Sequence, residues 1–143
     1  MNAKEYLQQI SDIDEDIANK VAERDNWKKI LHGNATNTTA AIGGERVQSS
    51  GSKQKLADAV DKYVDIERRI NDRIDELIAK KQEIVDTIDG LPFKYRDLLH
   101  KLYVQGYELQ EVADMKRKSY SNITTLHGHA ISALQKLLDA YGN

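Results

Sequence analysis

Apolar residues recur along most of this chain at steps of three and four, which is the spacing of one face of an α-helix. The first series is Leu7, Ile10, Ile13, Ile17 and Val21, followed by Ile30 and Leu31. Asn2 and Glu5 have the spacing of a capping box before this series, and Gly33 comes after it, where a C-terminal cap belongs. The pattern predicts a first long helix over residues 2–31.

A second apolar series follows a heptad repeat through residues 53–89. Its ten positions are Leu56, Val60, Tyr63, Glu67, Ile70, Ile74, Leu77, Lys81, Ile84 and Ile88. Eight of the ten are apolar, which is typical of a coiled coil. Glu67 and Lys81 interrupt the series, and they either set register and partner choice or lie at the edge of the apolar stripe. Other apolar residues widen the stripe beyond a two-stranded seam: Val64, Ile66, Ile78 and Val85.

Together the two series predict an antiparallel helical hairpin over residues 1–89. We expect the first helix to fold back on the second, and a second copy of the chain to cover the rest of the stripe. The residues expected at this oligomer contact are Leu56, Val60, Tyr63, Ile70, Ile74, Leu77 and Ile84. Between the helices, residues 33–52 contain four Gly, six Ser or Thr and two Asn. That composition predicts a loop that is either flexible or a contact surface.

The chain changes character after Gly90. Pro92 stands where the first residue of a helix belongs, and Gly106 interrupts the apolar spacing that follows. Three shorter helices are expected, at about residues 92–105, 108–115 and 119–140. The predicted fold is therefore all-α, with a long hairpin at 1–89 and a three-helix C-terminal domain at 91–143.

The last two of these helices fit a helix-turn-helix motif, whose recognition helix is apolar on one side and polar on the other. Val112 lies on the second helix of the motif, and Ala113 is small enough for the third to approach closely. The inner face of the third helix is expected to carry Ile123, Leu126, Ala130 and Leu134. The residues left outside are Ser119, Tyr120, Ser121, Asn122, Thr124, Thr125 and His127.

The distribution of charge also points to the C-terminal region as the DNA-binding part. The chain has a net charge of −2, but residues 1–91 carry 14 Lys and Arg against 18 Asp and Glu, whereas residues 92–143 carry 7 against 5. Lys116, Arg117 and Lys118 directly precede Ser119, which is a natural N-cap. Cations and free N–H groups at a helix N-terminus suit phosphate, and Asn122 could pair with an adenine edge.

We therefore expect a DNA-binding face made of these outward residues and the basic turn. Its members are Lys116, Arg117, Lys118, Ser119, Tyr120, Ser121, Asn122, Thr124, Thr125 and His127. Tyr120 could stack on a base or sugar, or it could equally pack on its own backbone. The alternative interpretation is a helical domain that only packs or oligomerises, with a solvated basic turn.

Residues 91–138 resemble region 4 of bacterial primary sigma factors and related helix-turn-helix domains. The residues that carry this resemblance are Leu91, Pro92, Leu98, Leu99, Leu102, Tyr103, Gly106, Glu111, Val112, Ala113, Ser119, Ile123, Ala130 and Leu134. The whole chain resembles the ArpU-like late-gene regulators of phages that infect Gram-positive bacteria, in residues 3–7 and 47–53 and in Leu126, His127, Gly128 and Ala130. The resemblance implies a transcriptional activator of phage or prophage genes.

One departure from the sigma-like pattern lies in the turn. Such domains usually carry Leu or Met three residues after the conserved Ala, then Gly or Asn, then an apolar residue. This chain has Lys116, Arg117 and Lys118 at those positions, so the turn loses apolar anchors and gains charge. Met115 and the lysine stems are the candidates to cover the gap.

Composition restricts the other function classes. The chain has no Cys, which excludes disulfides and cysteine-ligated metals. His127 and His129 have the wrong spacing for a helical metal pair, and the acids of residues 12–16 lack the Gly of a calcium loop. We expect no metal, no cofactor and no enzymatic activity. With no signal peptide and no membrane span in the sequence, the expected location is the cytoplasm of a bacterial host.

The expected function is sequence-specific binding of double-stranded DNA by a homodimer that regulates transcription. One alternative is a small-terminase-like protein for DNA packaging, which also joins a helix-turn-helix to an oligomerising hairpin. Another is an adaptor that binds host RNA polymerase without touching DNA.

Overall fold

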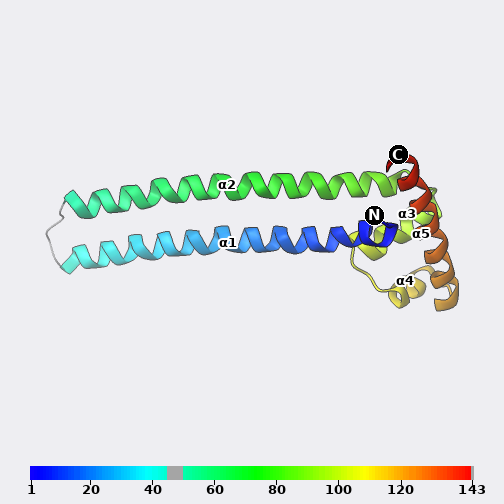
Figure 1. Cartoon of the computed structure of the whole chain (residues 1–143). Coiled ribbons are helices and arrows are strands. Elements are labelled where there is room, and N and C mark those ends of the chain that lie inside the picture. Colours follow the sequence, from blue (N-terminus) through cyan, green and yellow to red (C-terminus); the bar gives the residue numbers. More distant parts are fainter. Residues whose placement is uncertain (45–49, 143) are drawn as a thin grey trace. The chain divides into compact units, whose positions relative to one another are not determined.

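The computed structural model describes residues 1–44 and 50–142, with side chains described for residues 1–33 and 53–142. The described residues form five α-helices and one π-helical segment, which confirms the predicted all-α fold (Figure 1). In chain order these are α1 (Ala3–Gly44), α2 (Ser50–Asp89), α3 (Phe93–Leu99), η1 (His100–Val104), α4 (Leu109–Lys116) and α5 (Tyr120–Gly142).

Helices α1 and α2 pair antiparallel, as the two apolar series predicted (Figure 1). The Tyr6 hydroxyl donates to Thr87 Oγ1 over 3.0 Å, and Arg24 donates to Asn71 Oδ1 over 2.8 Å. The later residue on α1 therefore has the earlier partner on α2, as in an antiparallel pair. The predicted capping box at the start of α1 is confirmed, because the Glu5 N–H donates to Asn2 Oδ1 over 2.9 Å.

The chain divides into two compact units. Unit 1 comprises Met1–Glu15 and Ile78–Asn143, and unit 2 comprises Asp16–Leu77. The division differs from the expected boundary near residue 90, since both ends of the hairpin sequence belong with the C-terminal helices. The cause is packing at the start of α1, where Leu7 is fully buried and the Ala3 N–H donates to Gln135 Oε1 over 2.7 Å.

The heptad positions of α2 lie mainly on the side that the hairpin buries. Ile70, Leu77, Ile84 and Ile88 are buried, whereas Val60 is 39% exposed. The remaining members of the series are half-buried: Leu56, Tyr63, Glu67, Ile74 and Lys81. Three residues of the expected oligomer contact, Ile70, Leu77 and Ile84, are therefore already covered within one chain.

Both polar residues in the heptad series have partners. Lys81 forms an ion pair with Asp14 of α1, with its Nζ 2.7 Å from Asp14 Oδ1. Glu67 accepts a hydrogen bond of 2.7 Å from the Tyr63 hydroxyl one turn earlier on α2. That hydrogen bond raises the pKa of Tyr63, because it holds the proton on the phenol beside a carboxylate.

The expected loop over residues 33–52 is wrong for most of its length. Helix α1 continues through Gly33 to Gly44, and α2 begins at Ser50. Gly33 is thus an interior helical residue and not a C-terminal cap. One interior Gly costs a helix only about 1 kcal/mol relative to Ala, and the Ala residues at 35, 40 and 41 favour the helix. Residues 45–49, which include part of the segment 47–53 quoted above, lie outside the described residues.

The three short helical elements α3, η1 and α4 belong to unit 1. Pro92 precedes α3 as its N-cap, one position earlier than expected, and Gly106 breaks the chain after η1 with a φ of +82°. The domain core consists of Leu98, Val112, Ala113 and Ile123, with Leu102, Leu109 and Leu126 packed against it. Ala130 and Leu134 are also fully buried, so the predicted inner face of α5 is confirmed.

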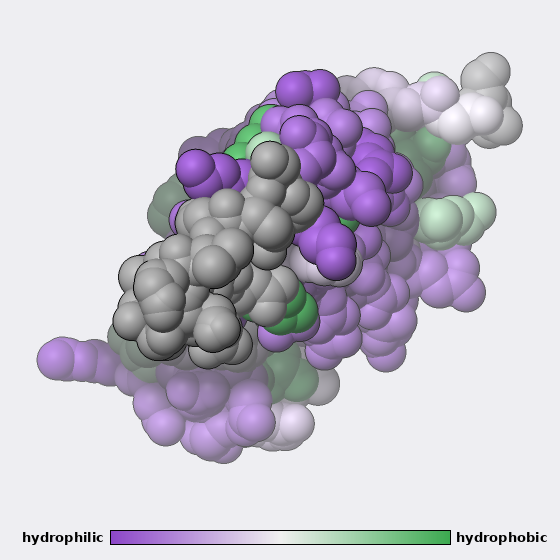
Figure 2. All heavy atoms as spheres, turned by 90° about the vertical axis from the view of Figure 1, so that its left-hand side faces the viewer, coloured by the Kyte–Doolittle hydropathy of each residue, from purple (hydrophilic) through white to green (hydrophobic). Residues whose placement is uncertain are grey.

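The coloured residues in Figure 2 are mostly hydrophilic, with smaller hydrophobic areas between them. Within the described residues, no helix is both long enough and apolar enough to cross a membrane.

Candidate nucleic-acid interface

The N-terminus of α5 is capped as the sequence predicts. The Ser119 Oγ accepts a hydrogen bond of 3.0 Å from the Asn122 N–H, and the Ser119 carbonyl accepts one of 3.1 Å from the Ile123 N–H. The cap fixes where α5 begins and leaves the first turn of the helix exposed. Its free N–H groups and helix dipole favour an anion at this point.

The turn between α4 and α5 is a Schellman motif. The Lys118 N–H donates to the Ala113 carbonyl over 2.9 Å, and the Arg117 N–H donates to the Asp114 carbonyl over 3.2 Å. Arg117 itself takes the left-handed conformation, with φ 57° and ψ 45°, which Gly or Asn adopts more readily. Met115 is 45% exposed, so it does not replace the apolar anchors that this turn lacks.

The expected DNA-binding face is largely exposed. Its exposed members are Arg117, Lys118, Ser119, Tyr120, Ser121, Asn122, Thr124 and Thr125. The Tyr120 side chain is 51% exposed, which leaves ring surface available for stacking. The Thr124 hydroxyl donates to the Tyr120 carbonyl over 2.9 Å, so its donor is already used within the helix.

A groove of about 490 Å³ lies beside this face, between the start of α3 and the first turns of α5. Its lining residues are Phe93, Lys94, Lys116, Lys118, Asn122, Thr125, Leu126 and His129. Three lysines therefore surround two of the polar residues that the sequence placed on the recognition face. The sequence interpretation missed Phe93, Lys94 and His129, although Phe93 and Lys94 directly follow the helix-start signal at Pro92.

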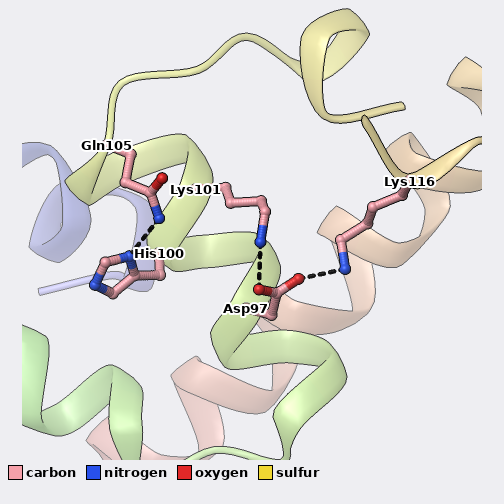
Figure 3. Close-up of polar contacts among 5 residues, drawn as sticks. All are labelled: Asp97, His100, Lys101, Gln105 and Lys116. Atoms are coloured by element: carbon pink, nitrogen blue, oxygen red, sulfur yellow. Dashed lines mark hydrogen bonds and ion pairs between the residues drawn. The ribbon is translucent and has the colours of Figure 1, made fainter. Parts of the chain in front are cut away.

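Lys116 is held inside unit 1 and is not a free cation. Its Nζ forms an ion pair with Asp97 Oδ2 of α3, and Lys101 Nζ of η1 contacts Asp97 Oδ1 (Figure 3). Partial burial acts to raise the pKa of Asp97, but hydrogen bonds from the two lysines and their charges outweigh it, so that pKa lies below its ordinary value. One carboxylate thus joins α3, η1 and the end of α4.

His127 is an exception among the expected outward residues. Its imidazole is half-buried and stacks on the Tyr103 ring with centroids 5.9 Å apart, and its Nε2 lies 2.9 Å from the Tyr103 hydroxyl. Burial lowers the pKa of His127, and the positive charge of Lys4 adds to the effect. The prediction that His127 faces outward is wrong, because Tyr103 of the π-helical segment covers its ring.

The remaining histidines give no metal centre. His100 Nδ1 lies 2.9 Å from Gln105 Nε2, as Figure 3 also shows. Among the residues whose positions are described, no three His, Asp or Glu side chains gather closely enough to hold a metal ion.

The site is therefore a cationic groove beside an exposed polar helix end, supported by a buried apolar core. Comparison of the chain with family models, with curated proteins and with solved structures found no match. The resemblance to sigma region 4 and to ArpU-like regulators accordingly stays a prediction.

Proposed function

We propose that this protein binds double-stranded DNA through α4, the turn at Arg117 and the first turns of α5. The observation that carries the proposal is the groove that brings Lys94, Lys116 and Lys118 beside Asn122 and Thr125. In a DNA duplex, phosphates line both sides of a groove in which base edges are exposed. Cations can bind those phosphates, and short polar side chains on an exposed helix can bind the base edges.

The B-DNA major groove is about 12 Å wide and admits one α-helix. With the start of α5 in that groove, Asn122 and Thr125 reach base edges, while Arg117 and Lys118 reach phosphates. Asn makes a bidentate pair with adenine, so Asn122 is the leading candidate for sequence readout. Contacts from the basic turn give affinity without sequence preference.

A regulatory role in transcription is the finer part of this proposal. Its support is the resemblance of residues 91–138 to sigma-like helix-turn-helix domains and of the whole chain to activators of phage late genes. A homodimer would present two recognition helices to a paired half-site. Among the side chains of unit 2 that the structure describes, four large apolar ones are exposed and could be covered by such a dimer: Trp27, Ile30, Val60 and Val64.

The proposal is tested by selecting DNA fragments with the purified full chain and then measuring affinity by fluorescence anisotropy. Asn122→Ala is expected to cost about 1–3 kcal/mol on the selected site and little on unrelated DNA. Lys118→Ala is expected to weaken both equally and to lower the salt slope by about 0.9. Ser132 and Lys136 are exposed further along α5, and their Ala variants are the matched controls.

No binding to any duplex at low salt would refute the proposal. Equal loss on selected and unrelated DNA in the Asn122 variant would instead show that the readout face is misplaced. Sedimentation at tens of micromolar tests the dimer separately, and a particle with the mass of one chain would remove that part.

A further inference from the structure

Lys116 belongs to two sites at once. Its side chain lines the cationic groove together with Lys94 and Lys118, and its ammonium group is paired with Asp97 (Figure 3). Lys94 and Lys118 differ from it, since neither forms an ion pair within the part of the chain that the structure describes. Lys94 Nζ lies 5.0 Å from the centre of the Tyr95 ring, and Lys118 is exposed.

The ion pair with Asp97 neutralises the charge of Lys116 beside the groove. The side chains of Lys116 and Asp97 are only 24% and 16% exposed, so solvent screens their attraction less than that of a fully exposed pair. The positive field of the groove therefore comes mainly from Lys94 and Lys118. An anion that enters the groove meets a Lys116 ammonium group that Asp97 already contacts.

We propose that Asp97 competes with DNA phosphate for Lys116 and so limits the affinity of the groove for DNA. This inference rests on the proposed function, and it assigns Asp97 a regulatory role at that same site. A phosphate oxygen can take the place of the carboxylate because both are anions that accept hydrogen bonds from an ammonium group.

Lys101 lowers the free-energy cost of moving Lys116 from Asp97 to a phosphate. When Lys116 leaves, Lys101 still contacts Asp97 Oδ1, so the carboxylate keeps one cationic partner. An unpaired, half-buried carboxylate beside DNA would otherwise oppose binding strongly. The lowered pKa of Asp97 keeps the group ionised at neutral pH, so the competition operates under the conditions of a binding assay.

Asp97→Asn is the decisive variant, because it removes the negative charge and keeps the shape of the side chain. Duplex affinity is expected to rise up to about fivefold, the scale of one partly exposed ion pair. The slope of log K against log salt is expected to steepen by up to about 0.9. Asp114→Asn is the matched control: this exposed acid on α4 is bonded to Gln110 and not to a lysine, so its removal should leave affinity and slope near those of the parent.

Lys116→Met provides an independent measurement if Asp97→Asn does not fold. Met keeps an unbranched apolar stem and removes the charge, so competition for phosphate predicts a salt slope lower by up to about 0.9. An unchanged slope in folded Lys116→Met, or unchanged or weaker binding by folded Asp97→Asn, would overturn the inference while leaving DNA binding intact. Failure of the parent protein to bind duplex at low salt would instead remove the proposed function, and this inference with it.

Discussion

Unit 1 and unit 2 use the same helical pattern but bury it to very different extents. Of the side chains that are described, unit 1 buries fourteen apolar residues, whereas unit 2 buries only Ile70 and Leu77. Trp27, Ile30, Val60 and Val64 of unit 2 are exposed, and unit 1 also exposes some large apolar residues, so the two units differ in what they bury. A single pair of helices can cover only the stripe that each turns toward the other, whereas crossing helices cover several sides of a core.

Helix length and stability are therefore separate properties in this chain. The long helices of unit 2 satisfy their backbone internally, yet they gain little from apolar burial. The short helices of unit 1 are stabilised mainly by tertiary packing. We therefore expect unit 2 to open more readily in hydrogen exchange than unit 1, which contains the candidate recognition helix.

A substitution in the core of unit 1 tests this comparison directly. Leu98→Ala removes a fully buried side chain from the core of unit 1 and should cost about 2–5 kcal/mol of unfolding free energy. Val60→Ala removes a partly exposed side chain from unit 2 and should change stability by about 0.5 kcal/mol or less. Urea denaturation followed by circular dichroism measures both. Equal losses of unfolding free energy would show that Val60 stabilises the chain as much as Leu98 does.

A smaller effect on stability is expected at Arg117, whose backbone takes the left-handed conformation in the turn of unit 1. The left-handed conformation costs a non-glycine residue about 1–2 kcal/mol, part of which Gly would lose again as backbone entropy. Arg117→Gly should therefore stabilise the protein by about 0.5–1 kcal/mol and yet weaken DNA binding, with a salt slope lower by about 0.9.

Arg117→Asn separates these two effects. Asn tolerates the left-handed region but carries no charge, so this variant should also bind DNA less tightly. Unchanged DNA affinity in both variants would mean that the strained residue serves only the turn.

Much of unit 1 was predictable because its signals are local. Apolar spacing identified the buried positions Val112, Ala113 and Ile123, and residue chemistry identified the caps at Asn2 and Ser119. These features depend on neighbours within one or two helical turns, where the period of the α-helix is a reliable guide.

The rest depends on residues distant in sequence or on weak local preferences. The pairing of Asp97 with Lys116 requires the ends of α3 and α4 to meet, which spacing alone does not reveal. His127 lies on the polar side of its own helix, and it is covered because η1 brings Tyr103 against it. The apolar spacing predicts a helix end at Gly33, but the small cost of one Gly does not stop a long helix.

A weaker effect is the pH dependence of stability that His127 gives to unit 1. Because burial lowers the pKa of His127 in the folded state, the unfolded chain binds the proton first as pH falls. The stability that the neutral ring contributes is complete above the unfolded value of about 6.5 and is lost as pH falls through the lowered folded value.

His127→Gln should therefore flatten the change in stability between neutral and mildly acid pH, as measured by urea denaturation at a series of pH values. His129→Gln is the matched control, because it makes the same substitution at an exposed position of the same helix. A profile that stays equally steep in the His127 variant would mean that burial of the His127 ring does not restrain its protonation. The sign discriminates as well, since stability that rises on acidification would require a folded state that binds the proton more tightly.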